Sequence, residues 1–88
     1  MPGVGRVGVD SAGGIITGAL VPNVRVNGSP IVVVGATVAP HGNGPHSNAT
    51  MAVGSSKVKA HGIPVCRAGD AATCSDTLSP GSSTVFAN

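Results

Sequence analysis

The sequence predicts a small all-β protein. The β-branched residues Val, Ile and Thr, which favour strands, dominate its regular stretches, and no segment repeats apolar residues at helical spacing. A second observation is a hairpin signature: Asn27-Gly28 stands between alternating apolar residues, and both residues tolerate the positive φ of a primed turn. Strands joined by tight turns are therefore the expected architecture.

This hairpin unit recurs along the chain. The unit at 23–35 is matched by a second at 57–69, and a third copy opens at 83–88 and stops where the turn glycine would come. A lone hairpin cannot bury its own face, so the repetition predicts pseudo-threefold packing. The equivalent turn positions are Asn27, His61 and Asn88.

The segments around the hairpins are expected to be one strand and three loops. Residues 1–10 alternate imperfectly, which predicts a first strand that ends before residue 11. Non-periodic loops are predicted at 10–18, 36–53 and 70–82. A hairpin has its turn at one end and its outer ends at the other. We therefore expect the loops to gather opposite the turns.

Composition limits both stability and function. Phe86 is the only aromatic residue, so the core is expected to be aliphatic, and small scaffolds of this kind gain stability from a metal, a disulfide or a partner. Charged residues make up 9% of the chain, with a net charge of +2, which argues against nucleic-acid binding. No signal peptide or membrane-spanning run is recognisable. We interpret 1–88 as a single domain without extension.

The cysteines and charged residues have different settings. Cys66 falls within a predicted strand and is expected to pack, whereas Cys74 lies in a loop, so no disulfide is expected. Asp10 and Asp70 follow strands and are expected to hydrogen-bond turn backbone. The five Lys and Arg residues are expected on solvent faces.

Two histidines and the loop cysteine predict a metal site. His41 and His46 lie in one Gly/Pro-rich loop, and imidazole and thiolate are ligands that zinc prefers, with iron the less favoured metal. Asp76 is the expected fourth ligand, because in an extended loop its side chain would face the same point as that of Cys74. His61 is the alternative, although the repeat places it in a hairpin turn roughly 13 Å from the loops.

A catalytic reading of the same residues is weaker. His41, Cys74 and Asp76 could serve as base, thiol nucleophile and orienting carboxylate. However, the chain offers no second domain to form a substrate cleft and few polar residues to line one. We therefore expect no enzyme and no catalytic residues.

The motif G-S-S-x-V-x-x-x-G-x-P-V-x-R-x-G-D at 54–70, its looser copy at 24–35 and the terminal 81–88 resemble the PAAR-repeat proteins. These proteins cap the spike of type VI secretion systems and of related contractile phage tails. The resemblance implies a cone with three β-faces, whose narrow end holds zinc through His41, His46 and Cys74. Many relatives have a histidine where this chain has 11–14, and Cys-Gly-His where it has 74–76, so the fourth ligand stays open.

The resemblance also implies a mechanical function. The chain would form the membrane-piercing tip of a contractile injection machine, with one copy seated by its broad base on a trimeric β-helical spike, VgrG-like or from a phage tail. Effector cargo and transient contact with a target membrane would follow. The protein would be made in the cytoplasm and delivered out of the cell at the tip of the apparatus. The low charge favours an apolar base contact. A free-standing metal-binding adaptor module without a spike is the alternative.

Overall fold

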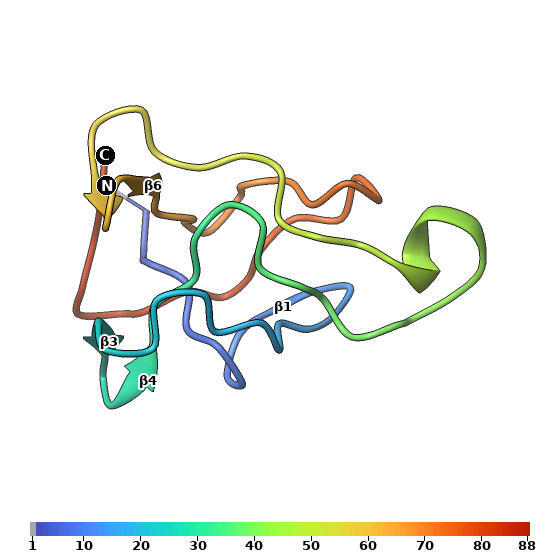
Figure 1. Ribbon diagram of the computed structural model, residues 1–88, viewed down its shortest axis with the longest axis horizontal. Coiled ribbons are helices and arrows are strands. Elements are labelled where there is room, and N and C mark those ends of the chain that lie inside the picture. The colour runs from blue at the N-terminus through green and yellow to red at the C-terminus, as the bar shows by residue number, and fades with distance from the viewer. Residues whose placement is uncertain (1) are drawn as a thin grey trace.

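The computed structural model describes residues 2–88 as short antiparallel hairpins joined by extended chain (Figure 1). The elements in chain order are β1 (Ser11–Ala12), β2 (Gly14–Ile15), β3 (Arg25–Val26), β4 (Ser29–Pro30), the 3-10 helix η1 (Gly44–Ser47), β5 (Lys59–Ala60) and β6 (Ile63–Pro64). This part of the chain contains no α-helix, and none of its helical structure is long or apolar enough to span a membrane. The all-β prediction is confirmed.

Three extended segments, 4–6, 31–33 and 65–67, close on one another around a common axis. The antiparallel bridges between them are Arg6 to Ile31, Val33 to Val65 and Arg67 to Val4. The central residues form a cycle of backbone hydrogen bonds: Gly5 N to Cys66 O (3.0 Å), Cys66 N to Val32 O (2.9 Å) and Val32 N to Gly5 O (3.1 Å). Because each segment is paired on both sides, the ring has no free strand edge. This ring is the predicted pseudo-threefold arrangement.

A hairpin extends from each segment of the ring, and the third hairpin is built from the two ends of the chain. The equivalent residue pairs are Arg25 with Pro30, Lys59 with Pro64, and Phe86 with Gly3. The predicted first strand therefore supplies the return strand that the terminal copy lacks. At the other two turns Asn27 and His61 have φ of 52° and 49°, each followed by a glycine, as the hairpin signature predicts.

One loop prediction is wrong. The segment 10–18 contains the hairpin β1–β2, in which Ser11 pairs with Ile15 and Ala12 pairs with Gly14. Gly13 forms its turn with φ of 86°, a conformation that glycine adopts without steric cost. The first strand is also interrupted, since only Gly3, Val4 and Arg6 of the described part of 1–10 make bridges.

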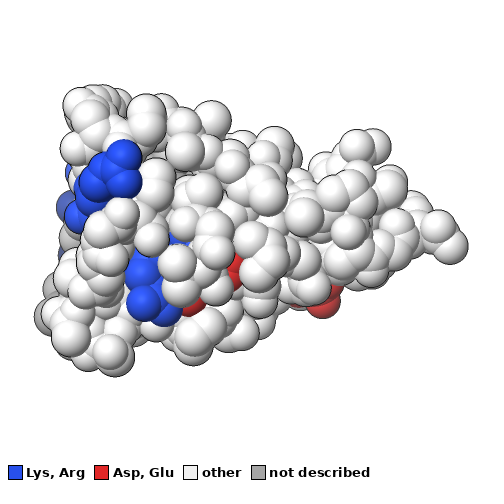
Figure 2. Space-filling model, turned by 90° about the horizontal axis from the view of Figure 1, so that it is seen from below, with Lys and Arg blue, Asp and Glu red and all other residues white. Residues whose placement is uncertain are grey.

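The turns and the long loops lie at opposite ends of the molecule. Figure 1 shows β3, β4 and β6 together with both chain ends at one end, and η1 at the other. Figure 2 shows that the body narrows towards the loops, and its extents are 32 × 23 × 21 Å. The predicted cone, with its hairpins at the broad end and its loops at the narrow end, is confirmed.

The core is aliphatic, as the composition predicts, and its largest fully buried side chains are Ile16, Met51 and Leu78. Cys66 packs within it, fully buried, and donates its thiol hydrogen to Val53 O at 3.2 Å. Burial raises the pKa of this thiol to about 12. Both cysteines are free and buried.

Two of the five cations do not lie on solvent faces as expected. Arg6 binds the fully buried Asp10 with both arms of its guanidinium, at 2.9 and 2.8 Å, and Arg67 binds Asp70 in the same way. The carboxylates also accept backbone N–H groups, Asp10 from Arg6 at 2.8 Å and Asp70 from Arg67 at 2.7 Å, as predicted for turns. Strand alternation suggested exposure, but a buried carboxylate requires a paired cation.

Candidate metal centre

The loop 36–53 turns back on itself and brings its two histidines together. The helix η1 carries His46, whose carbonyl accepts a hydrogen bond from the backbone N–H of His41 at 3.1 Å. The imidazole rings meet edge to face, with centroids 4.9 Å apart. The spacing of five residues therefore places both rings on the same side of the loop.

The loop 70–82 positions Cys74 and Asp76 through a tight turn. Ala71 pairs with Thr77, and Ala72 N donates to Asp76 O at 2.8 Å, so the chain reverses between them. Ser75 takes φ of 74° at the tip of this turn. The two side chains converge as expected, but the cause is a reversal of the backbone and not the extended loop that we assumed.

Backbone contacts tie the two loops to each other. Met51 forms an antiparallel bridge with Ala72, and the N–H of Thr73 donates to the carbonyl of Thr50 at 2.8 Å. A side-chain contact adds to these, because Thr50 N donates to Thr73 Oγ1 at 3.1 Å. The loops that carry the four side chains therefore form one structural unit.

His41, His46, Cys74 and Asp76 form a cluster in which one potential ligand atom from each lies within 4.8 Å of all the others. The distances are 2.9 Å from His41 Nε2 to Asp76 Oδ2, 3.0 Å from His41 Nε2 to His46 Nδ1, 3.3 Å from His46 Nδ1 to Asp76 Oδ2, and 3.6 Å from Cys74 Sγ to both His41 Nε2 and Asp76 Oδ2. Around a tetrahedral zinc ion, ideal bond lengths give about 3.3 Å between nitrogen or oxygen ligands and about 3.6 Å to sulfur. The cluster is therefore a candidate metal site of suitable size and chemistry.

His41 is the most constrained of the four side chains. Its Nδ1–H donates to Ala39 O at 3.0 Å, and its Nε2 faces the other three side chains. The hydrogen bond to the carbonyl of Ala39 raises the pKa of His41. Partial desolvation opposes this rise, and Asp76 adds to it. The hydrogen bond that the protonated His41 donates to Asp76 lowers the pKa of that carboxyl. In the neutral ring the proton on Nδ1 leaves a lone pair on Nε2 directed into the cluster, which is the tautomer that a metal requires.

The centre is buried on one side and open on the other. The side chain of His41 is 14% exposed and Cys74 is buried, whereas the side chains of His46 and Asp76 are 37% and 40% exposed. The cluster therefore borders solvent through His46 and Asp76. His61, the alternative fourth ligand, lies exposed in the β5–β6 turn and is not part of this cluster.

Gly13 is a residue of the site that the sequence interpretation missed. A Cβ at this position would lie 2.5 Å from His41 Nε2 and closer still to Asp76 Oδ2. The β1–β2 turn thus contributes no potential ligand, but the absence of a side chain at Gly13 leaves room for the four clustered side chains. The signal in the sequence was the pair Gly13-Gly14, which we interpreted only as a loop.

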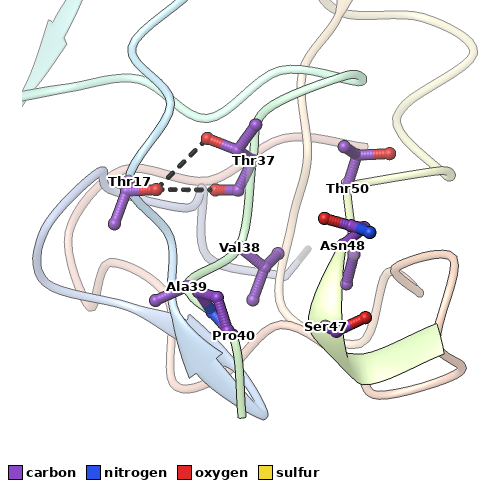
Figure 3. A pocket seen from close by; sticks show the side chains of 9 residues that line it. Thr17, Thr37, Val38, Ala39, Pro40, Ser47, Asn48 and Thr50 are labelled. Atoms are coloured by element: carbon purple, nitrogen blue, oxygen red, sulfur yellow. Dashed lines mark hydrogen bonds between the residues drawn. The ribbon is translucent and has the colours of Figure 1, made fainter. Parts of the chain in front are cut away.

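A separate shallow pocket of about 400 Å³ lies beside the loops (Figure 3). Its rim includes Thr17, whose hydroxyl lies 3.1 Å from Thr37 Oγ1. The lining residues are Thr17, Thr37, Val38, Ala39, Pro40, Ser47, Asn48, Ala49 and Thr50. None of these carries an ionisable side chain, so the pocket presents no acid, base or activated nucleophile.

The closed ring, the taper and the His/Cys/Asp cluster near the narrow end define a small, tapered all-β domain with a candidate metal site. The family model of the PAAR motif matches residues 8–80 of the 88-residue chain. The chain belongs to the PAAR-motif family, which confirms the resemblance drawn from its repeats. No curated protein matches the sequence. The family is one of structural spike-tip proteins of contractile injection systems.

Proposed function

We propose that this protein is the tip of the membrane-piercing spike of a contractile injection machine, either a type VI secretion system or a phage tail. The closed pseudo-threefold ring carries this proposal, because it lets one chain present three equivalent hairpin ends at its broad end. One copy would then cap three identical subunits of a β-helical spike. The narrow end would meet the target membrane, and the protein would leave the cell with the apparatus.

The proposal includes a single structural zinc-like ion held by His41, His46, Cys74 and Asp76. The fit of their mutual distances to a tetrahedral site supports it. When bound, the ion would cross-link two loops that are distant in sequence. Such a link would stiffen the narrow end, where the chain has no Phe, Tyr or Trp side chain to pack.

The function needs no catalytic turnover. The four clustered side chains are mutually engaged, and the pocket beside the loops has no ionisable lining. Shape and stiffness are sufficient for a tip. Substrate turnover by the pure protein, abolished by one substitution that spares folding, would overturn this part of the proposal.

The test is size-exclusion chromatography with light scattering on the protein mixed with a trimeric β-helical spike protein, VgrG-like or from a phage tail. A stable complex of one chain with one trimer supports the tip. If the two proteins elute separately while the metal stays bound, the free-standing adaptor module is the better account.

A further inference from the structure

The charges of this small protein are distributed unevenly. Of its five cations, Arg6 and Arg67 are neutralised by two of the three carboxylates. The third carboxylate, Asp76, belongs to the cluster near the narrow end. The remaining cations, which have no carboxylate partner within the described residues, are Arg25, Lys57 and Lys59.

These three cations lie on the hairpins of the broad end. Arg25 is in β3 and Lys59 in β5, at equivalent positions of the threefold arrangement, and Lys57 precedes β5. All three are exposed. Arg25 Nη1 donates to Gly28 O at 3.0 Å, which holds the guanidinium over its own turn. On the face that Figure 2 shows, the Lys and Arg atoms lie on the broad half, and none is seen at the narrow end.

The third equivalent position is apolar. Phe86 pairs with Gly3 where Arg25 and Lys59 pair with prolines, and this residue is 47% exposed. Val58 and Val85, which precede Lys59 and Phe86, are each 38% exposed. The broad end therefore combines unpaired cations with exposed apolar side chains, a composition typical of a docking surface with a polar rim.

We propose that the broad end recognises a trimeric partner whose terminal surface carries carboxylates around an apolar centre. Arg25 and Lys59 each face the carboxylate of a different partner subunit. Phe86, at the third equivalent position, packs on the apolar surface of the partner, and the carboxylate of that third subunit stays in solvent. The inference rests on the proposed function and specifies the chemistry of its partner. It also revises the expectation of an uncharged base contact, because the low net charge of +2 conceals a local excess of three cations.

The test compares R25Q/K59Q with N48D/A52D for binding to a trimeric β-helical spike protein, VgrG-like or from a phage tail. Both variants lower the net charge by two, but Asn48 and Ala52 are exposed residues of the loop 36–53. Exposed ion pairs contribute about 0.2 to 1 kcal/mol each, so R25Q/K59Q should weaken binding by about 2- to 30-fold at low salt. The wild-type association rate should fall between 50 and 300 mM salt, and that of R25Q/K59Q should fall less.

The outcomes separate this inference from the function on which it rests. The inference is supported if N48D/A52D keeps wild-type affinity while R25Q/K59Q loses it. An equal loss when carboxylates at the spike end are changed to amides also supports it. Wild-type binding that is salt-independent and unaffected by R25Q/K59Q overturns the inference and leaves the spike-tip function intact. Failure of the wild type to bind the spike at all removes both.

Discussion

Removal of His41 should release the metal and destabilise the protein, whereas removal of His61 should do neither. His41 Nε2 faces the other three members of the cluster, so H41A leaves at most three ligands and opens the buried side of the site. His61 is an exposed turn residue outside the cluster. It is the matched control, because both variants replace one imidazole with a methyl group.

The size of the effect follows from linkage. A metal present at 100 times its dissociation constant stabilises the folded state by about 2.7 kcal/mol. For a domain of this size each kcal/mol corresponds to about 4 to 8 °C, so loss of the ion should lower Tm by roughly 10 to 20 °C. Removal of the metal from the wild type by a chelator should lower its Tm by the same amount, and the Tm of H41A should change little when chelator is added.

Two measurements test this prediction. Elemental analysis should find one ion per chain in the wild type and in H61A, and much less in H41A and in D76A. Thermal unfolding with and without chelator should rank the variants in the same order. The assignment of ligands would be refuted if H61A lost the metal while D76A kept it.

Three further predictions concern other parts of the molecule. G13A should lose metal, because a Cβ at this position would enter the cluster. G8A is the control, because Gly8 has a similar positive φ but open space around it, and this variant should lose stability without losing metal. Elemental analysis and thermal unfolding measure the two effects. Cys66 is buried and its pKa is about 12, so it should resist thiol reagents for as long as the protein is folded. Cys74 should react only after the metal is removed by a chelator. Labelling of both cysteines in the metal-free but folded protein would contradict this. Burial alone would raise the pKa of Asp10, but the hydrogen bonds from Arg6 and Gly81 together outweigh it, so the pKa lies below the ordinary value of 3.8. The ionised Asp10 should therefore stabilise the fold above pH 3.8, and this stabilisation should be lost as the pH falls through the pKa of the folded state. The free energy of unfolding against pH tests this, and D10N should show a smaller change in that window.

The sequence was informative where local signals agree with the fold. Asn27-Gly28 and His61-Gly62 form the turns that the repeat predicts, since only a few residue types accept their positive φ. The return strand of the third hairpin could not be predicted from the sequence in the same way. This strand lies at the opposite end of the chain, and no local pattern links Gly3 with Phe86.

The candidate site was predictable in its ligand types but not in its surroundings. His41, His46, Cys74 and Asp76 carry recognisable metal chemistry, so their loops could be singled out before the structure was known. Gly13 carries none, and its importance follows only from how closely the β1–β2 turn approaches the cluster.

The ion pairs of the ring were missed for a related reason. Arg6 and Asp10 are four residues apart in irregular chain, a spacing that predicts contact in a helix but not in a strand. Burial of the carboxylate, which requires the paired guanidinium, becomes apparent only from the packing.

The central claim is that one chain, with one bound ion, caps one trimeric spike. Native mass spectrometry of the reconstituted complex counts both the chains and the ions bound to each spike trimer in a single experiment. The account predicts a mass equal to that of the spike trimer plus one 8.4 kDa chain and one zinc-sized ion. Three chains on each trimer, or a complex that forms with no ion bound, would contradict it.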